Sequence, residues 1–151
     1  MKIHFNHAEP AEASAETLFE VITDYAGYPR FNPAVVKVTV VAKDENGAEF
    51  VAKRKTAIAR QVRAFDRYER HGDLIVERTY GPQSTGRSRW AIHPIDASHS
   101  TLTIDASITV SRLRGLVMKP FLRRLFYGIN FTPFIQEAER RAKKRGSSQV
   151  P

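Results

Sequence analysis

The feature that most constrains the fold is a region of period-two alternation between residues 35 and 110, interrupted only by short turn signals. Alternating apolar and polar residues are typical of half-buried strands, because successive side chains of a strand point to opposite faces. The connections at residues 44–47, 71–72, 81–86 and 97–100 are too short for the crossover that parallel strands need. We therefore predict six consecutive antiparallel strands in this region.

The residues before this region add one strand and one helix. Residues 2–9 alternate Ile3, Phe5 and Ala8 with polar residues, which makes a seventh strand. Residues 14–25 then offer Ser14 as an N-cap and carry an apolar face, as an amphipathic helix does. The sequence YPRFNP that follows permits at most a short second helix.

The C-terminal segment is predicted to be one long helix whose large apolar residues cover a wide arc. A surface helix needs only one apolar stripe, so this helix has to be surrounded. We predict that it begins between Leu116 and Phe121, bends near Pro133 and ends at Gly146, leaving residues 147–151 as a flexible tail. A sheet with one apolar face, curled around this helix, would surround it.

Composition fits one α+β domain over residues 1–146. The chain of 151 residues is 42% hydrophobic and 26% charged, and it contains no cysteine. Disulfides, thiolate metal sites and cysteine nucleophiles are therefore excluded. The N-terminus has no apolar core of signal-peptide length, and no apolar run approaches the length of a membrane span. We expect a cytoplasmic protein, either a monomer or a homodimer.

The net charge of +8 raises the possibility of a polyanionic partner. Much of the excess lies in the runs KRK at residues 53–55 and RRAKKR at residues 140–145. The second run ends a predicted helix, where cations interact favourably with the helix dipole. Since no recognised nucleic-acid motif accompanies either run, we expect a solvated basic surface, with binding of a polyanion as the alternative.

Three segments together resemble a known family. The segment AEASAETLFEVITDYAGYPRFNPAVVKVTVV, at residues 11–41, resembles the opening of the polyketide cyclase/dehydrase and lipid-transport group. That group belongs to the START-like (SRPBCC) superfamily, whose fold is the helix grip. The strand RSRWAIHP, the strand TLTIDASITV and the terminal helix fit the same scheme. The resemblance implies a seven-stranded antiparallel sheet wrapped around the C-terminal helix, with an apolar ligand cavity between them.

The pattern of hydrophobicity predicts which strand residues face that cavity. Trp90 and Ile104 lie on the apolar faces of their strands. In the strand DLIVERTY, the same reasoning turns Val76 inward and carries Arg78 and Tyr80 to the same face. We therefore predict an arginine and a tyrosine on an otherwise apolar wall.

A buried arginine needs an anionic or polar partner. For Arg78 the candidates are Asp66, or a carboxylate, enolate or phosphate of a ligand. The facing of the strand at residues 61–70 stays open. One face would bury Val62, Ala64 and Tyr68, and the other carries Arg63, Phe65 and Arg67.

The candidate ligand-binding residues are one set, drawn from the short helix, the sheet and the last helix. Tyr28 is included because the resembling aromatic cyclases carry a pocket-lining aromatic at its position. Trp90 is equally compatible with plain core, and Asn130 with a solvated helix surface. Arg78 and Tyr80 are also the catalytic candidates. The full set is Tyr28, Phe31, Val76, Arg78, Tyr80, Trp90, Ile104, Phe126, Asn130 and Phe134.

No cofactor or metal is expected. The five histidines have no mutual ligand spacing, no carboxylate pair suggests an acid and a base, and no glycine-rich phosphate loop is present. The leading hypothesis is a protein that binds an apolar small molecule of lipid, polyketide or isoprenoid type. A polyketide cyclase or dehydratase is the alternative. A second alternative is an interaction protein similar to the coenzyme-Q-binding and ribosome-associated branches of the superfamily.

Overall fold

The computed structural model describes residues 1–55, 58–68, 72–81, 84–113, 115, 121 and 131–148. Its described strands form one seven-stranded sheet in the order β1-β7-β6-β5-β4-β3-β2, and every neighbouring pair is antiparallel. This confirms the prediction from the alternating pattern. The strands are β1 Lys2–Ala11, β2 Val35–Asp44, β3 Gly47–Arg54, β4 Ile58–Tyr68, β5 Gly72–Gly81, β6 Ser84–Pro94 and β7 Ser100–Val110.

The turn between β2 and β3 shows how local chemistry sets the register of the sheet. The side-chain oxygen Oδ1 of Asp44 accepts hydrogen bonds from the backbone N–H groups of Asn46, at 2.8 Å, and Gly47, at 3.0 Å. A Cβ atom at position 47 would collide with the backbone carbonyl of Arg63 on β4. Glycine is therefore needed here for β3 to approach β4 closely.

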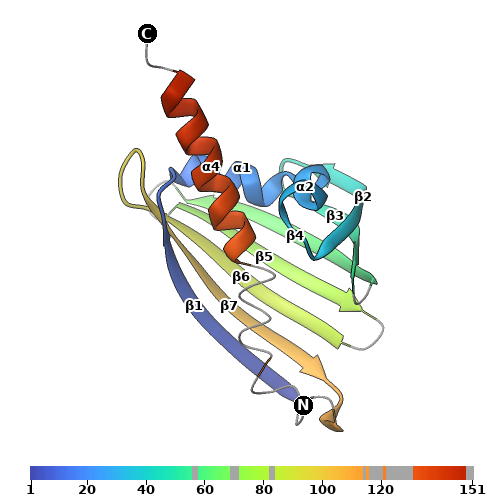
Figure 1. Cartoon of the computed structure of the whole chain (residues 1–151). Helices are drawn as coiled ribbons and strands as arrows, with labels where there is room; N and C mark the ends of the chain where they lie inside the picture. Colours follow the sequence, from blue (N-terminus) through green and yellow to red (C-terminus); the bar gives the residue numbers. More distant parts are fainter. Residues whose placement is uncertain are drawn as a thin grey trace.

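The first helical region follows β1 and closes one end of the sheet (Figure 1). Helix α1, Ala15–Thr23, begins at Ser14, whose side chain accepts a hydrogen bond from the backbone N–H of Thr17 at 3.1 Å, as the sequence predicted. A 3₁₀ turn, Tyr25–Gly27, is capped in the same way by Asp24, and the short helix α2, Tyr28–Phe31, comes directly after it.

The last helix, α4, runs over Thr132–Ser148 and packs beside α1 (Figure 1). Phe131 and Phe134 are buried against Trp90 of β6, with ring centroids 5.5 Å and 5.6 Å from the indole. Phe134 also meets Tyr28 of α2 at 5.1 Å between centroids. Residues of the sheet and the helices thus form one continuous core, to which α4 contributes Phe134, Ile135 and Ala138.

Two predictions about this helix need correction. Pro133 lies in the first turn of α4 rather than at a bend within it, a position where the missing N–H of proline costs no hydrogen bond. The helix also continues through Gly146 to Ser148. The helix was predicted to begin between Leu116 and Phe121, and of this range residues 116–120 lie outside the described residues.

The basic run of α4 is largely paired with acidic groups of the protein. Arg141 contacts Asp24 at 2.6 Å and Glu137 at 2.8 Å, and Arg145 contacts Glu20 at 2.6 Å. The pairs with Glu20 and Asp24 join α4 to α1 and to the residue that follows α1. Within the described part of the chain, no helix is long and apolar enough to cross a membrane.

Candidate functional site

The inner face of β5 is not the one that hydrophobicity predicted. Ile75 and Glu77 are buried, at 0% and 5% exposure, whereas Arg78 is exposed and Tyr80 is 46% exposed. The register of β5 against β6 explains this, because Ile75 lies opposite Trp90 and cross-strand partners share a face of the sheet. The inward placement of Trp90 was predicted correctly, and the inward placement of Val76, Arg78 and Tyr80 was wrong.

The neighbouring strand β4 follows the same register. Arg63 lies directly opposite Glu77, and Gln61 lies opposite Thr79. Both Arg63 and Gln61 are 2% exposed. Of the two facings left open for this strand, the one that buries Arg63 is therefore found. The side chain of Asp66, the predicted internal partner of Arg78, lies outside the described part of the structure.

Arg63 is the centre of a buried polar cluster. Its guanidinium donates to the Glu77 carboxylate, to the hydroxyl oxygen of Tyr28 and, at 2.9 Å, to the backbone carbonyl of Ile22. The hydroxyl of Tyr28 in turn donates to the same Ile22 carbonyl. The carbonyl lies near the end of α1, where carbonyls lack helical partners, so the cluster also satisfies part of that helix end.

Aromatic rings enclose the same guanidinium. Its central carbon lies 5.2 Å from the ring centroid of Trp90, 5.3 Å from that of Phe50, and 5.5 Å and 5.6 Å from those of Tyr28 and Tyr25. Such distances are within the range of cation–π attraction. Four rings and one carboxylate thus hold this cation in place.

Glu77 is as fully engaged as Arg63. Its carboxylate accepts hydrogen bonds from Gln61 Nε2 at 2.8 Å, from Thr79 Oγ1 at 3.0 Å and from Arg63. Burial acts to raise the pKa of Glu77, but the charge and hydrogen bonds of Arg63 outweigh it and hold the pKa below its usual value. Both partners are therefore ionised at neutral pH.

Burial shifts the other groups of the cluster as well. Burial acts to lower the pKa of Arg63, but the charge of Glu77 and the nearby tyrosines outweigh it, so the pKa of Arg63 lies above its ordinary value. Burial also raises the pKa of Tyr25 to about 12 and that of Tyr28 beyond its usual range. Both phenols are consequently neutral at physiological pH.

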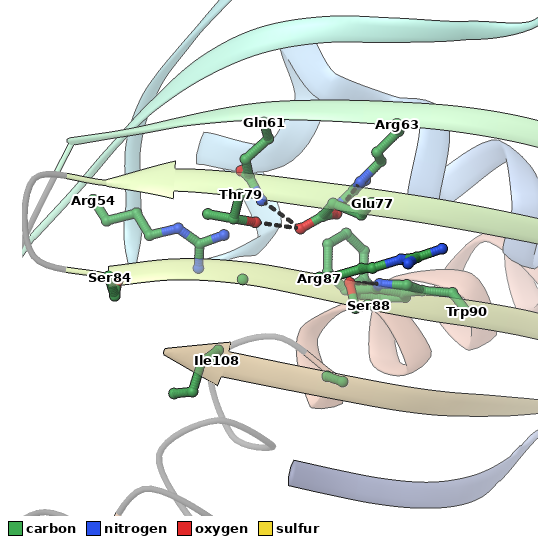
Figure 2. A pocket seen from close by; sticks show the side chains of 13 residues that line it. Arg54, Gln61, Arg63, Glu77, Thr79, Ser84, Arg87, Ser88, Trp90 and Ile108 are labelled. Atoms are coloured by element: carbon green, nitrogen blue, oxygen red, sulfur yellow. Dashed lines mark hydrogen bonds and ion pairs between the residues drawn. The ribbon is translucent and has the colours of Figure 1, made fainter. Parts of the chain in front are cut away.

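A cavity of about 130 Å³ lies against this cluster, between the inner face of the sheet and the start of α4. Figure 2 shows Gln61, Thr79 and Arg63 converging on Glu77 at its wall. One part of the lining is polar and charged and the other is apolar. Among the described residues, the lining consists of Arg54, Gln61, Arg63, Glu77, Thr79, Ser84, Gly86, Arg87, Ser88, Trp90, Ala106, Ile108 and Phe134.

Arg54 contributes a second cation to the cavity. It belongs to the KRK run, for which a solvated surface was predicted. Its side chain is instead half-buried and lines the cavity wall (Figure 2). Burial lowers the pKa of Arg54, an effect that the charge of Glu77 opposes. The alternation of buried Ala48, Phe50 and Ala52 along β3 continues to this residue and could have revealed its facing.

The structure brings some of the predicted residues together at the cavity and leaves others away from it. Trp90 and Phe134 line it, and the Trp90 indole donates to Ser88 Oγ at 2.8 Å. Tyr28 and Phe31 pack behind Phe134, with ring centroids 5.1 Å and 5.8 Å from it. Ile104 is buried in the core, while Val76, Arg78 and Tyr80 lie on the outer face. Phe126 and Asn130 lie outside the described residues.

Four polar residues of the cavity wall form the buried cluster, namely Gln61, Arg63, Glu77 and Thr79, and none of them was among the predicted site residues. One signal for them was present, since Arg63 and Glu77 are opposite charges on neighbouring strands. A metal site is not indicated either: among the described residues, no three His, Asp or Glu side chains are grouped so that they could hold an ion.

The seven-stranded antiparallel sheet, the long C-terminal helix and the cavity between them define a START-like helix-grip protein. The sequence itself matches the family model described as polyketide cyclase / dehydrase and lipid transport over residues 11–132. The chain belongs to this family. No curated protein matches the sequence.

Solved structures agree on the fold. The chain is similar to the Zhui aromatase/cyclase from Streptomyces sp. R1128, with 18% identity, a TM-score of 0.77, and 97% of this chain and 99% of that chain covered. It is also similar to the di-domain ARO/CYC StfQ from the steffimycin biosynthetic pathway, with 15% identity, a TM-score of 0.79, and 97% and 52% covered. A START superfamily protein from Mycobacterium smegmatis gives 17% identity, a TM-score of 0.67, and 94% and 98% covered. At these identities the likeness shows the fold alone.

Proposed function

We propose that the protein binds a small molecule with an apolar ring and a polar substituent in the cavity between the sheet and α4. The observation that carries this proposal is the division of the cavity lining. Trp90, Phe134 and Ile108 offer apolar surface, while Gln61 and Glu77 offer polar atoms opposite. Ligand sites in proteins commonly combine an apolar lining with a few fixed polar groups.

The size of the cavity bears on the kind of ligand. Its volume of about 130 Å³ is close to that of engineered apolar cavities that bind benzene, roughly 150 Å³. It is smaller than most sites for drug-sized ligands, which measure roughly 300–1,000 Å³. Among the ligand types considered from the sequence, this favours a ring of polyketide or isoprenoid origin over the acyl chain of a lipid.

A cavity-filling substitution tests this proposal. Ala106 lines the cavity and is 2% exposed, so Ala106→Phe would place a ring in the ligand's volume. Ala91→Phe is the matched control, because Ala91 lies on β6 with its side chain on the outer face. In isothermal titration calorimetry with toluene, the wild-type chain and Ala91→Phe should bind and Ala106→Phe should not. Equal binding to all three chains would refute this site.

A second candidate function is cyclisation of a linear poly-β-ketone. Arg54 is a half-buried cation at the cavity wall, and a fixed cation in a water-poor site can stabilise a developing enolate. The cavity of about 130 Å³ has room for the ring that closes rather than for the whole chain, and it would hold the reacting carbons of that ring close together. The similarity to the Zhui aromatase/cyclase and to the di-domain ARO/CYC StfQ supports this candidate. It predicts that the wild-type chain accelerates ring closure of a poly-β-ketone and that Ala106→Phe does not.

The third possibility, a polyanion-binding protein, gains less support. Arg140, Arg141 and Arg145 of the basic run each contact a carboxylate of the protein at 2.6–2.8 Å. Their charges are therefore already used within the fold. This favours a small-molecule ligand over nucleic acid or a ribosome as the partner.

A further inference from the structure

The amide of Gln61 has one polar atom that the protein leaves unused. Its Nε2 donates to Glu77 Oε1 at 2.8 Å, and this bond to a carboxylate fixes which way the amide is turned. Its Oε1 accepts no hydrogen bond from any residue in the described part of the chain. Gln61 is 2% exposed and its side chain belongs to the cavity wall, so this acceptor is shielded from bulk water beside the cavity (Figure 2).

The polar side chains beside this oxygen are committed elsewhere. Thr79 Oγ1 donates to Glu77 at 3.0 Å, and the Arg63 guanidinium donates to Glu77, Ile22 and Tyr28. A buried acceptor without a donor is costly, and native proteins rarely leave one. The missing donor is therefore expected to come from whatever occupies the cavity.

The charges around the cavity limit what that donor can be. Among the described lining residues, the charged side chains on the inner face of the sheet are the cations Arg54 and Arg63 and the carboxylate Glu77. An ammonium group would enter a site with an excess of positive charge, which disfavours it. A neutral hydroxyl supplies a donor without adding charge.

We propose that Gln61 Oε1 is the acceptor for a hydroxyl group carried by the ring of the ligand, so that the cavity selects phenol-like or enol-like molecules over hydrocarbons and amines. This inference rests on the proposed function, because it assumes that the cavity is the ligand site. It adds the chemical class of the ligand and the atom that recognises it.

The test compares two probes of equal size, phenol and toluene, by isothermal titration calorimetry. Toluene measures the apolar contribution to binding, and the ratio of the phenol and toluene dissociation constants isolates the contribution of the hydroxyl group. In Gln61→Met, phenol should bind roughly ten-fold more weakly than to the wild-type chain, the effect of about one net hydrogen bond, while toluene changes little. Benzylamine, protonated at neutral pH, should bind more weakly than phenol to the wild-type chain.

Tyr28→Phe is the matched control, because it removes a hydroxyl from the same polar cluster, lies behind Phe134 rather than in the cavity lining, and leaves Gln61 Oε1 in place. The ratio for this variant should equal the wild-type ratio. If Tyr28→Phe changes the ratio as much as Gln61→Met does, the effect belongs to the cluster as a whole and the inference is wrong. If Gln61→Met leaves the ratio of the two dissociation constants unchanged, the inference about Gln61 is wrong. The proposed function still stands in that case, provided that toluene binds. If neither probe binds the wild-type chain, the proposed function itself fails.

A second measurement needs no variant and covers the case in which Gln61→Met does not fold. The side-chain carbonyl resonance of Gln61 in NMR spectra of the wild-type chain should move when phenol is added and stay in place when toluene is added. Equal movement with both probes would refute a hydrogen bond from the hydroxyl to this oxygen.

Discussion

Replacing Glu77 by glutamine keeps the shape of the side chain and removes the charge that faces Arg63. In the wild-type chain the two residues are 5% and 2% exposed, and the guanidinium donates directly to the carboxylate. Removing one partner of a buried ion pair leaves an uncompensated charge and costs about 3–5 kcal/mol. The whole fold of a domain is worth only about 5–15 kcal/mol, so the loss is a large fraction of the stability.

We therefore expect Glu77→Gln to lower the free energy of unfolding by about 3–5 kcal/mol in urea titrations. For a chain of this length, the midpoint of thermal unfolding should fall by about 6–20 °C. Glu49→Gln is the matched control. Glu49 also pairs with an arginine across neighbouring strands, but Arg60 is 56% exposed, and such pairs contribute about 0–1 kcal/mol. Similar losses of stability in Glu77→Gln and Glu49→Gln would show that burial does not determine how much such an ion pair stabilises the fold.

Two further predictions concern the same cluster. Because the folded pKa of Glu77 is depressed, its contribution to stability is present above the unfolded pKa of about 4.3 and is lost as the pH falls through the folded pKa. Acid unfolding of Glu77→Gln, followed by circular dichroism, should consequently depend less on pH below about 4 than that of the wild-type chain. Tyr28→Phe removes a hydroxyl that donates to Ile22 and accepts from Arg63, and should cost about 1–3 kcal/mol in urea titrations. Tyr80→Phe, at a hydroxyl on the outer face, should cost less than about 0.5 kcal/mol, and a reversed order would contradict the assignment of these contacts.

The fold could be predicted from the sequence because each of its elements follows from local chemistry. Alternation gave the strands, Ser14 marked the start of α1, and short connections required antiparallel pairing. The facing of β6 was predicted because Trp90 and Ile92 make one of its faces clearly apolar.

The facing of β5 was not predicted, and the reason is physical. Hydrophobicity assigns the more apolar face to the interior, but here the buried face carries Glu77 and Thr79 and the outer face carries Leu74 and Val76. A polar group is buried only where a specific partner compensates it, and that partner lies on another strand. The pairing register was therefore needed. Gly81 pairs with Ser84, which brings Ile75 opposite Trp90 and decides the facing of the whole strand.

The pairing of Arg63 with Glu77 also has a consequence for how the chain can diverge. Replacing either Arg63 or Glu77 alone gives a destabilised protein. Descendants are therefore expected to keep both residues or to exchange both together. The apolar wall is less constrained at Ile108, which is only partly buried, because a change of one methyl group there costs about 0.5–1.5 kcal/mol. Selection can thus reshape the ring-binding side of the cavity step by step, while its polar side is inherited as a unit.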